Sequence, residues 1–125
     1  MMSELCFGYR KLNAYQHAMS FAAEVYKLLR LFPKEEQYAL CDQLRRATVS
    51  IPSNIAEGMG RVSIKEQVHF IEIAFGSLNE VMCQLELAYS FGYISKEQFV
   101  AVEEQVSVLA KLLSSLRKSK MQKAK

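Results

Sequence analysis

The sequence predicts an all-α protein of one domain, an antiparallel up-down-up-down four-helix bundle over residues 1–125. Pro33, a glycine-containing turn at residues 58–63 and Gly92 divide the chain into four segments of about 20–30 residues. Within each segment, apolar residues recur three and four positions apart, as on one side of a helix, rather than alternating as in a strand. Because the connections are short, consecutive helices are expected to run antiparallel.

The first segment is expected to be a helix from about Arg10 to Leu31, preceded by a short N-terminal arm at residues 1–9. Pro33 ends it, since proline cannot continue a helix. The apolar stripe predicted to face the core is Leu12, Tyr15, Met19, Ala22, Tyr26 and Leu29.

The second helix is expected from about Lys34 to Met59, with Glu35 and Glu36 in its first turn, where the helix dipole favours acidic residues. Its predicted core stripe is Cys41, Leu44, Thr48, Ile51 and Ile55. Pro52 lies inside this helix and cannot donate to the carbonyl of Thr48, so we expect the helix to be kinked at Pro52.

Serine caps define the starts of the last two helices. Ser63-x-x-Glu66 and Ser95-x-x-Gln98 are capping-box patterns, and Gly92 suits the left-handed position after the third helix. The fourth helix carries an unbroken seam of Phe99, Val102, Val106, Leu109, Leu113 and Leu116.

The third helix carries more apolar side chains than one bundle core is expected to use. They extend over roughly half its circumference, wider than the usual stripe of about 100°. Those residues are Phe70, Ile71, Ala74, Phe75, Leu78, Val81, Met82 and Leu85. Since large apolar patches are seldom left in water, we expect a homo-oligomer to cover the excess.

A polar ridge is predicted opposite the apolar stripe of the second helix, formed by Asp42, Arg46, Ser50, Ser53, Glu57 and Arg61. Two acid-first pairs four residues apart, Asp42 with Arg46 and Glu57 with Arg61, are expected to form ion pairs. Arginines held in this way could face a subunit contact or a phosphate.

The residues give no support for an enzyme or a cofactor. His17 and His69 have no serine or cysteine partner in a recognisable motif. Glu66-x-x-His69 is half of a di-iron motif, but no second pair exists, so we expect no metal. Neither a P-loop nor a dinucleotide fingerprint is present, and no cofactor is predicted.

Cysteines and hydropathy indicate a cytoplasmic protein. Cys6, Cys41 and Cys83 are odd in number and far apart, which favours buried thiols over disulfides or zinc ligands. No apolar run is long enough for a membrane span, and no export signal is expected.

The net charge of +3 is distributed unevenly along the chain. Five positive charges fall in the tail at residues 117–125, which leaves residues 1–116 with a net charge of −2. The tail could engage phosphates through charge alone, or it could be an ordinary solvated helix end.

The sequence resembles a family of bacterial four-helix-bundle proteins first noticed as reading frames in intervening sequences of 23S ribosomal RNA genes. The resemblance spans nearly the whole chain. Its longest part is Ser50-Ile-Pro-Ser-Asn-Ile-Ala-Glu-Gly58, which contains Pro52, Asn54, Glu57 and Gly58 as a structural motif. Further matches are Glu24-Val-Tyr26, Phe32-Pro33, Gln43-Leu-Arg-Arg-Ala47, Gly60-Arg61, Ala74-Phe-Gly-Ser77, Glu80, Leu85 and Gly92-Tyr-Ile94.

The resemblance implies an up-down bundle, a pentameric ring and no enzyme activity. A related branch comprises accessory proteins of diversity-generating retroelements, which present basic surfaces and work with nucleic acid and a reverse transcriptase. The acidic body of this chain departs from that branch, because a nucleic-acid platform is expected to be strongly basic.

Two functions therefore stay open. One is a nucleic-acid-associated accessory protein that binds RNA or DNA through many copies of a basic surface. The residues proposed for that surface are Arg45, Arg46, Arg61, Arg117, Lys118 and Lys120. The alternative is a protein-interaction scaffold with no nucleic-acid role, which the acidic body favours.

Overall fold

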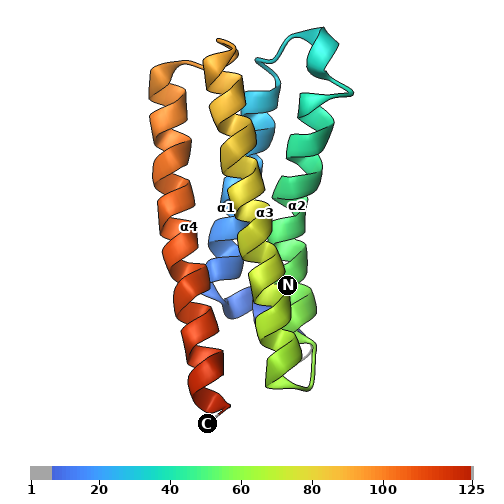
Figure 1. Ribbon diagram of the computed structural model, residues 1–125, viewed down its shortest axis with the longest axis vertical. Helices are drawn as coiled ribbons and strands as arrows, with labels where there is room; N and C mark the ends of the chain where they lie inside the picture. Colours follow the sequence, from blue (N-terminus) through green and yellow to red (C-terminus); the bar gives the residue numbers. More distant parts are fainter. Residues whose placement is uncertain (1–6, 125) are drawn as a thin grey trace.

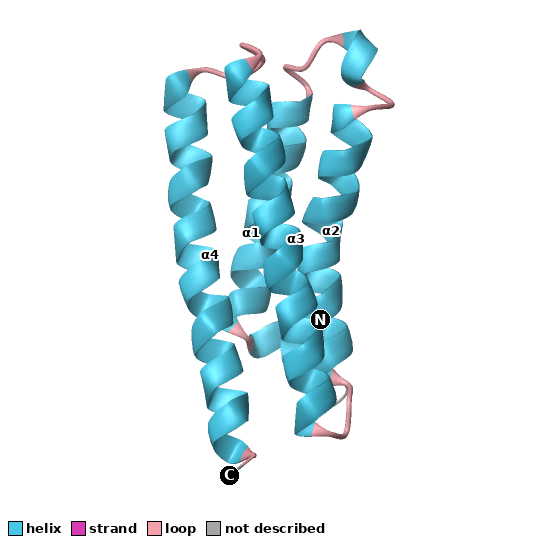
Figure 2. Ribbon diagram, in the orientation of Figure 1, coloured by secondary structure: helices cyan, strands magenta, loops and turns pink. Residues whose placement is uncertain are grey.

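Four long α-helices make up the computed structural model, which describes residues 7–124 (Figure 1). The helices are α1 (Asn13–Leu29), α2 (Leu40–Met59), α3 (Ile64–Ser90) and α4 (Lys96–Lys123). Two 3-10 helices, η1 (Gly8–Lys11) and η2 (Lys34–Glu36), precede α1 and α2. Both α1 and α3 pack against α2 and α4, which confirms the predicted up-down bundle. The described residues include no strand (Figure 2).

The helix ends follow the predicted local signals. The Ser63 hydroxyl accepts a hydrogen bond from the Glu66 backbone N–H at 3.1 Å. Ser95 and Gln98 form a full capping box, with bonds of 3.1 and 2.8 Å in the two directions. Gly92 follows α3 with φ of 80°, a conformation that glycine adopts without steric cost.

The core stripes predicted for the second and fourth helices are confirmed. All five stripe residues of α2, from Cys41 to Ile55, are buried. In α4, Val102, Leu109 and Leu113 are buried, and the other three seam residues pack against the core. Both helices therefore direct a single continuous apolar face into the bundle.

The core stripe predicted for the first helix is correct for Leu12, Tyr15 and Leu29, which are in the core or pack against it, and wrong for the other three residues. The buried face of α1 consists of Ala14, Ala18, Phe21, Val25 and Leu29. Of the predicted stripe, only Leu29 is fully buried, and Met19 and Tyr26 are 50% and 42% exposed. The helix carries two neighbouring apolar stripes, and the stripe that contains alanines, whose small side chains permit close helix packing, is the one that faces the core.

The wide apolar face predicted for the third helix is largely covered within the chain. Five of the eight side chains, Ile71, Ala74, Leu78, Val81 and Leu85, are buried. The remaining three are half-buried, because α2 and α4 flank α3 on both sides. This face therefore gives no reason for self-association, and homo-oligomerisation stays a prediction.

The second helix starts later than predicted, at Leu40 rather than near Lys34. Residues 34–36 instead form η2, and Ala39 has non-helical dihedral angles. A tertiary contact accompanies this departure: the Tyr93 hydroxyl donates to the Glu36 carboxylate at 2.8 Å. That hydrogen bond, followed by desolvation, raises the pKa of Tyr93 above its ordinary value.

Helix α2 continues across Pro52, which is buried, and the kink stays a prediction. The expectation of buried thiols is correct for Cys41 and wrong for Cys83, which is exposed on α3; Cys6 lies outside the described residues. Within residues 7–124, no helix combines the length and the apolar character needed to cross a membrane.

Candidate functional site

One end of the bundle gathers basic side chains from three separate parts of the sequence. The 3-10 helix η1, the α2–α3 connection and the end of α4 all lie at this end (Figure 1). Residues 7–12, 56–73 and 116–124 supply eight basic and three acidic side chains. The basic side chains are Arg10, Lys11, Arg61, Lys65, Arg117, Lys118, Lys120 and Lys123. We call this region the basic end.

The two arginines predicted for the site at this end are held by carboxylates. Arg61 forms an ion pair with Glu57 at 3.1 Å, as predicted, and its guanidinium also lies 4.8 Å from the centre of the Phe70 ring. Arg117 lies 3.8 Å from a Glu72 oxygen. Since both pairs are partly exposed, each is weak and leaves the guanidinium accessible to solvent.

The two lysines predicted for the site differ in their surroundings. Lys118 is exposed on the last turns of α4, which is helical as far as Lys123. Lys120 is half-buried and lines a cavity of about 540 Å³ with Phe7, Tyr9 and Met59. Burial, followed by the nearby charge of Lys123, lowers the pKa of Lys120.

Arg45 and Arg46 lie near the other end of α2, so the structure does not bring them together with Arg61. The fourteen residues from Arg45 to Met59, where α2 ends just before Arg61, correspond to roughly 21 Å. Arg45 donates to Asp42 at 2.7 Å and to the Gln37 carbonyl at 3.3 Å. The predicted pairing of Asp42 with Arg46 is therefore wrong, because the carboxylate is engaged by Arg45 one position earlier. Arg46 is exposed.

The motif residues Asn54 and Gly58 join α2 to α3. The Asn54 amide donates to the Ser50 carbonyl at 2.7 Å and to its hydroxyl at 2.8 Å, and that hydroxyl bonds Ser77 of α3 at 2.8 Å. Gly58 lies directly against α3, since a Cβ atom there would fall 2.8 Å from the Phe70 Cβ. These residues serve the packing of α2 against α3.

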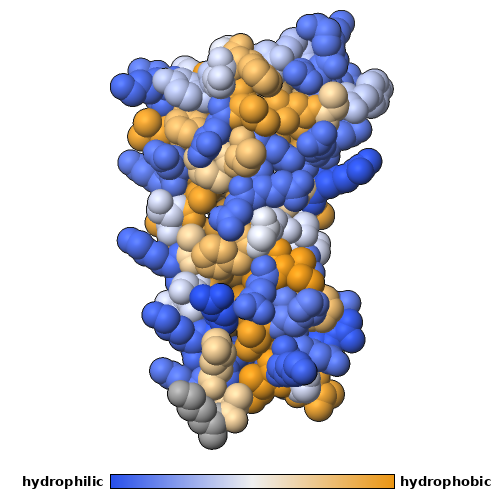
Figure 3. All heavy atoms as spheres, in the orientation of Figure 1, coloured by the Kyte–Doolittle hydropathy of each residue, from blue (hydrophilic) through white to orange (hydrophobic). Residues whose placement is uncertain are grey.

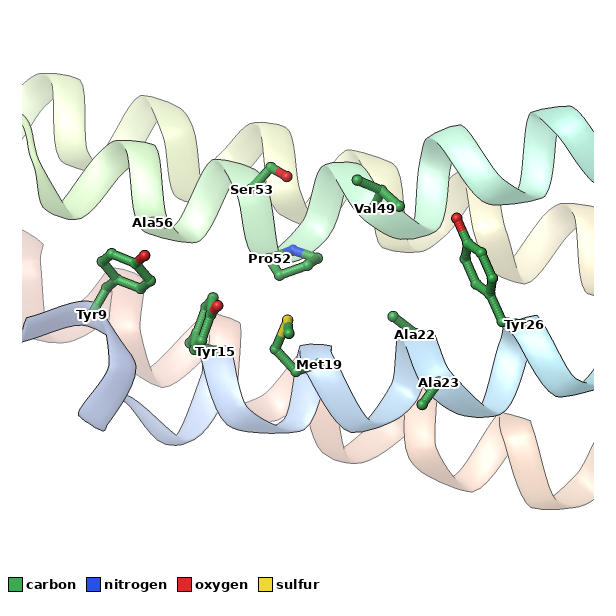
Figure 4. A pocket seen from close by; sticks show the side chains of 10 residues that line it. All are labelled: Tyr9, Tyr15, Met19, Ala22, Ala23, Tyr26, Val49, Pro52, Ser53 and Ala56. Atoms are coloured by element: carbon green, nitrogen blue, oxygen red, sulfur yellow. The ribbon is translucent and has the colours of Figure 1, made fainter. Parts of the chain in front are cut away.

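A groove between α1 and α2 is the feature that the sequence analysis missed. It encloses about 620 Å³ and contains no charged residue in its lining. In Figure 4, Met19 of α1 and Pro52 of α2 point toward each other across it, between Tyr15 and Tyr26. The signal was present in the sequence, because a helix with two apolar stripes can bury only one of them in its own bundle.

The two histidines are exposed, and the structure gives neither of them a nucleophile as a partner. His69 packs its ring edge-on against Phe70, and no hydrogen bond joins either histidine to a serine or cysteine among the described residues. In residues 7–124, no group of three or more side chains is placed to hold a metal ion.

The described residues form a four-helix up-down bundle with one basic end and an open apolar groove between α1 and α2. The chain belongs to the 23S rRNA-intervening sequence protein family, whose model matches residues 10–115. The same bundle occurs in a solved structure from Bacteroides thetaiotaomicron, a protein of unknown function from the S23 ribosomal protein family. The two chains are 26% identical with a TM-score of 0.76, covering 84% of this chain and 98% of the other. No curated protein matches the sequence.

Proposed function

We propose that this chain is a non-enzymatic, self-associating bundle that acts as a nucleic-acid-associated accessory protein. The observation that carries this proposal is the unequal charge of the two ends of the bundle. The basic end has eight basic and three acidic side chains, whereas residues 27–46 and 80–104, toward the other end, have six basic and eight acidic ones. The acidic body and the basic surface therefore occupy different places in one molecule.

Self-association would raise the affinity for nucleic acid, because a surface that binds weakly in one copy is then present in several. In a ring of parallel bundles, such as the pentamer that the family resemblance implies, the basic ends of all copies lie on one rim. Each copy then adds phosphate contacts to the same nucleic acid, and linked weak contacts can strengthen binding by about 10²–10⁴. The proposed contacts are Arg61, Arg117, Lys118 and Lys120, while Arg45 and Arg46 lie outside this surface.

A protein-interaction scaffold is the second candidate, favoured by the ion pairs. Arg45, Arg61 and Arg117 each face a carboxylate, which reduces the charge available to phosphate. In this alternative the assembly docks a protein partner and binds no nucleic acid. A reverse transcriptase, the partner suggested by retroelement accessory proteins, is compatible with both candidates, as is a cytoplasmic location.

Binding of the purified chain to labelled RNA and DNA across a salt series distinguishes these two candidates. We expect affinity to fall steeply as salt rises, because each phosphate contact releases a counterion. A chain truncated after Leu116 lacks the basic tail and is expected to bind at least about tenfold more weakly, with a shallower salt slope. Circular dichroism of the truncated chain is the control for folding. Absence of binding at low salt would leave only the scaffold.

A further inference from the structure

The apolar groove between α1 and α2 continues into a further cavity at each of its ends. The central cavity shares Tyr9 and Ala56 with the cavity at the basic end, and it shares Tyr26 with a third cavity beside Pro33. We call these three connected cavities the α1–α2 groove. Since α1 alone contributes seventeen residues, the groove runs for roughly 25 Å along the helix axis.

Every charged side chain that lines this groove is basic. Arg30, Lys34 and Arg45 line the cavity at one end, and Lys120 lines the cavity at the other. The middle is apolar, with Met19 and Val49 about half exposed at 50% and 45%. Of the cations, Arg45 already pairs with Asp42, whereas Arg30 and Lys34 are exposed at the rim. A fitting occupant therefore has an apolar ridge that carries carboxylates.

The outer side of α3 has this chemistry. Ile73 and Leu87 are exposed large apolar side chains, and Glu80 lies midway between them at spacings of seven residues. Since seven residues make nearly two helical turns, these three side chains form one line, which we call the α3 ridge. Glu72 and Glu86 each lie one residue from an end of this line, about 100° further round the helix. Glu72 already lies 3.8 Å from Arg117 of its own chain. Beyond Glu66 the charged residues of α3 are all glutamates. Figure 3 shows hydrophobic atoms interspersed with hydrophilic ones over the α3 side of the molecule.

Ridge and groove match in length and are opposite in the sign of their charges. The fourteen residues from Ile73 to Leu87 correspond to roughly 21 Å, close to the length of the groove. Seating the ridge would place Glu80 over the apolar middle, which Tyr15 and Tyr26 also line, and Glu86 toward one basic end. A single-stranded nucleic acid fits less well, because the middle of the groove offers no cation to follow a phosphate backbone.

We propose that the α3 ridge of one copy occupies the α1–α2 groove of a second copy. This inference rests on the self-association in the proposed function, and it adds the two surfaces that meet. Because the ridge and the groove are different surfaces, the contact is heterologous and repeats from copy to copy.

A charge-exchange experiment tests this contact. Met19→Glu places a carboxylate in the groove opposite Glu80, and Glu80→Lys places a cation on the ridge between the two basic ends of the groove. Each single variant is expected to lose the oligomer and sediment as one protomer of 14.3 kDa at micromolar concentration. One chain carrying both changes is expected to regain assembly, because the carboxylate introduced in the groove then faces the cation introduced on the ridge.

The controls separate this inference from the proposed function. Val62→Glu, at a position 99% exposed in the α2–α3 connection, is expected to leave the oligomer intact, and unchanged circular dichroism shows that each variant folds. A monomeric wild type would overturn self-association itself. An oligomeric wild type that withstands either single change would overturn only the groove contact, as would failure of the double variant to reassemble.

Discussion

Phe21→Ala is expected to destabilise the protein by about 3–5 kcal/mol, whereas Met19→Ala should cost less than about 1 kcal/mol within the protomer. Phe21 is 1% exposed in the core, and Met19, two residues earlier, is 50% exposed in the groove. Removing the buried ring forfeits its transfer free energy and leaves a cavity, while Met19 loses only contacts at the surface. Urea unfolding of both variants measures the difference.

Protein concentration provides the control for that comparison. A core residue contributes the same free energy of unfolding in the monomer and in the assembly, so the loss at Phe21 should persist on dilution. Any loss at Met19 should shrink as the protein dissociates. A larger loss at Met19 than at Phe21 in dilute protein would show that the sequence-predicted stripe faces the core after all.

Gly58→Val is expected to destabilise the bundle by at least about 2 kcal/mol through overpacking. The new Cβ would lie 2.8 Å from the Phe70 Cβ and 3.3 Å from the Gln67 carbonyl oxygen, and the backbone atom cannot move without shifting α3. A valine in a helix is otherwise favoured over glycine, so propensity opposes this loss. Thermal or urea unfolding measures the net result.

Gly76 is the matched control for the packing argument at Gly58. It lies inside α3, and an added Cβ would meet nothing within 4 Å. Gly76→Ala is therefore expected to stabilise the protein by about 0.5–1 kcal/mol through helix propensity alone. If both substitutions stabilise the protein, the contact between α2 and α3 at Gly58 has room for a side chain.

Most of the fold could be predicted from local sequence signals, because these depend only on residues that are neighbours in the chain. Ser63, Ser95 and Gly92 end or begin helices through their own backbone and hydroxyl groups, so spacing alone locates them. The face of α1 could not be found in this way. Periodicity identifies apolar stripes but does not tell which of two stripes faces the partner helices, and the larger side chains of the groove stripe favoured the wrong choice.

Tertiary contacts also explain why the candidate site was predicted only in part. The antiparallel topology places the α2–α3 connection and the tail at the same end of the bundle. Arg61 and Lys118 therefore belong to the same surface. The same topology places Arg46 toward the opposite end, which the list of basic residues did not reveal. The pairings of Arg45 with Asp42 and of Arg117 with Glu72 depend on rotamers and on packing between helices, which the sequence pattern does not specify.

Charge reversal at the two ends of the bundle tests the central claim most directly. Lys118→Glu with Lys123→Glu changes two exposed residues of the basic end, and Arg46→Glu with Lys96→Glu makes the same change in charge toward the other end. In RNA and DNA binding across one salt series, we expect the first pair to lower affinity at least about tenfold and to make the salt slope shallower by about 1–2, while the second pair retains the wild-type slope. Equal losses from both pairs, or a larger loss from the second, would contradict a nucleic-acid interface at the basic end.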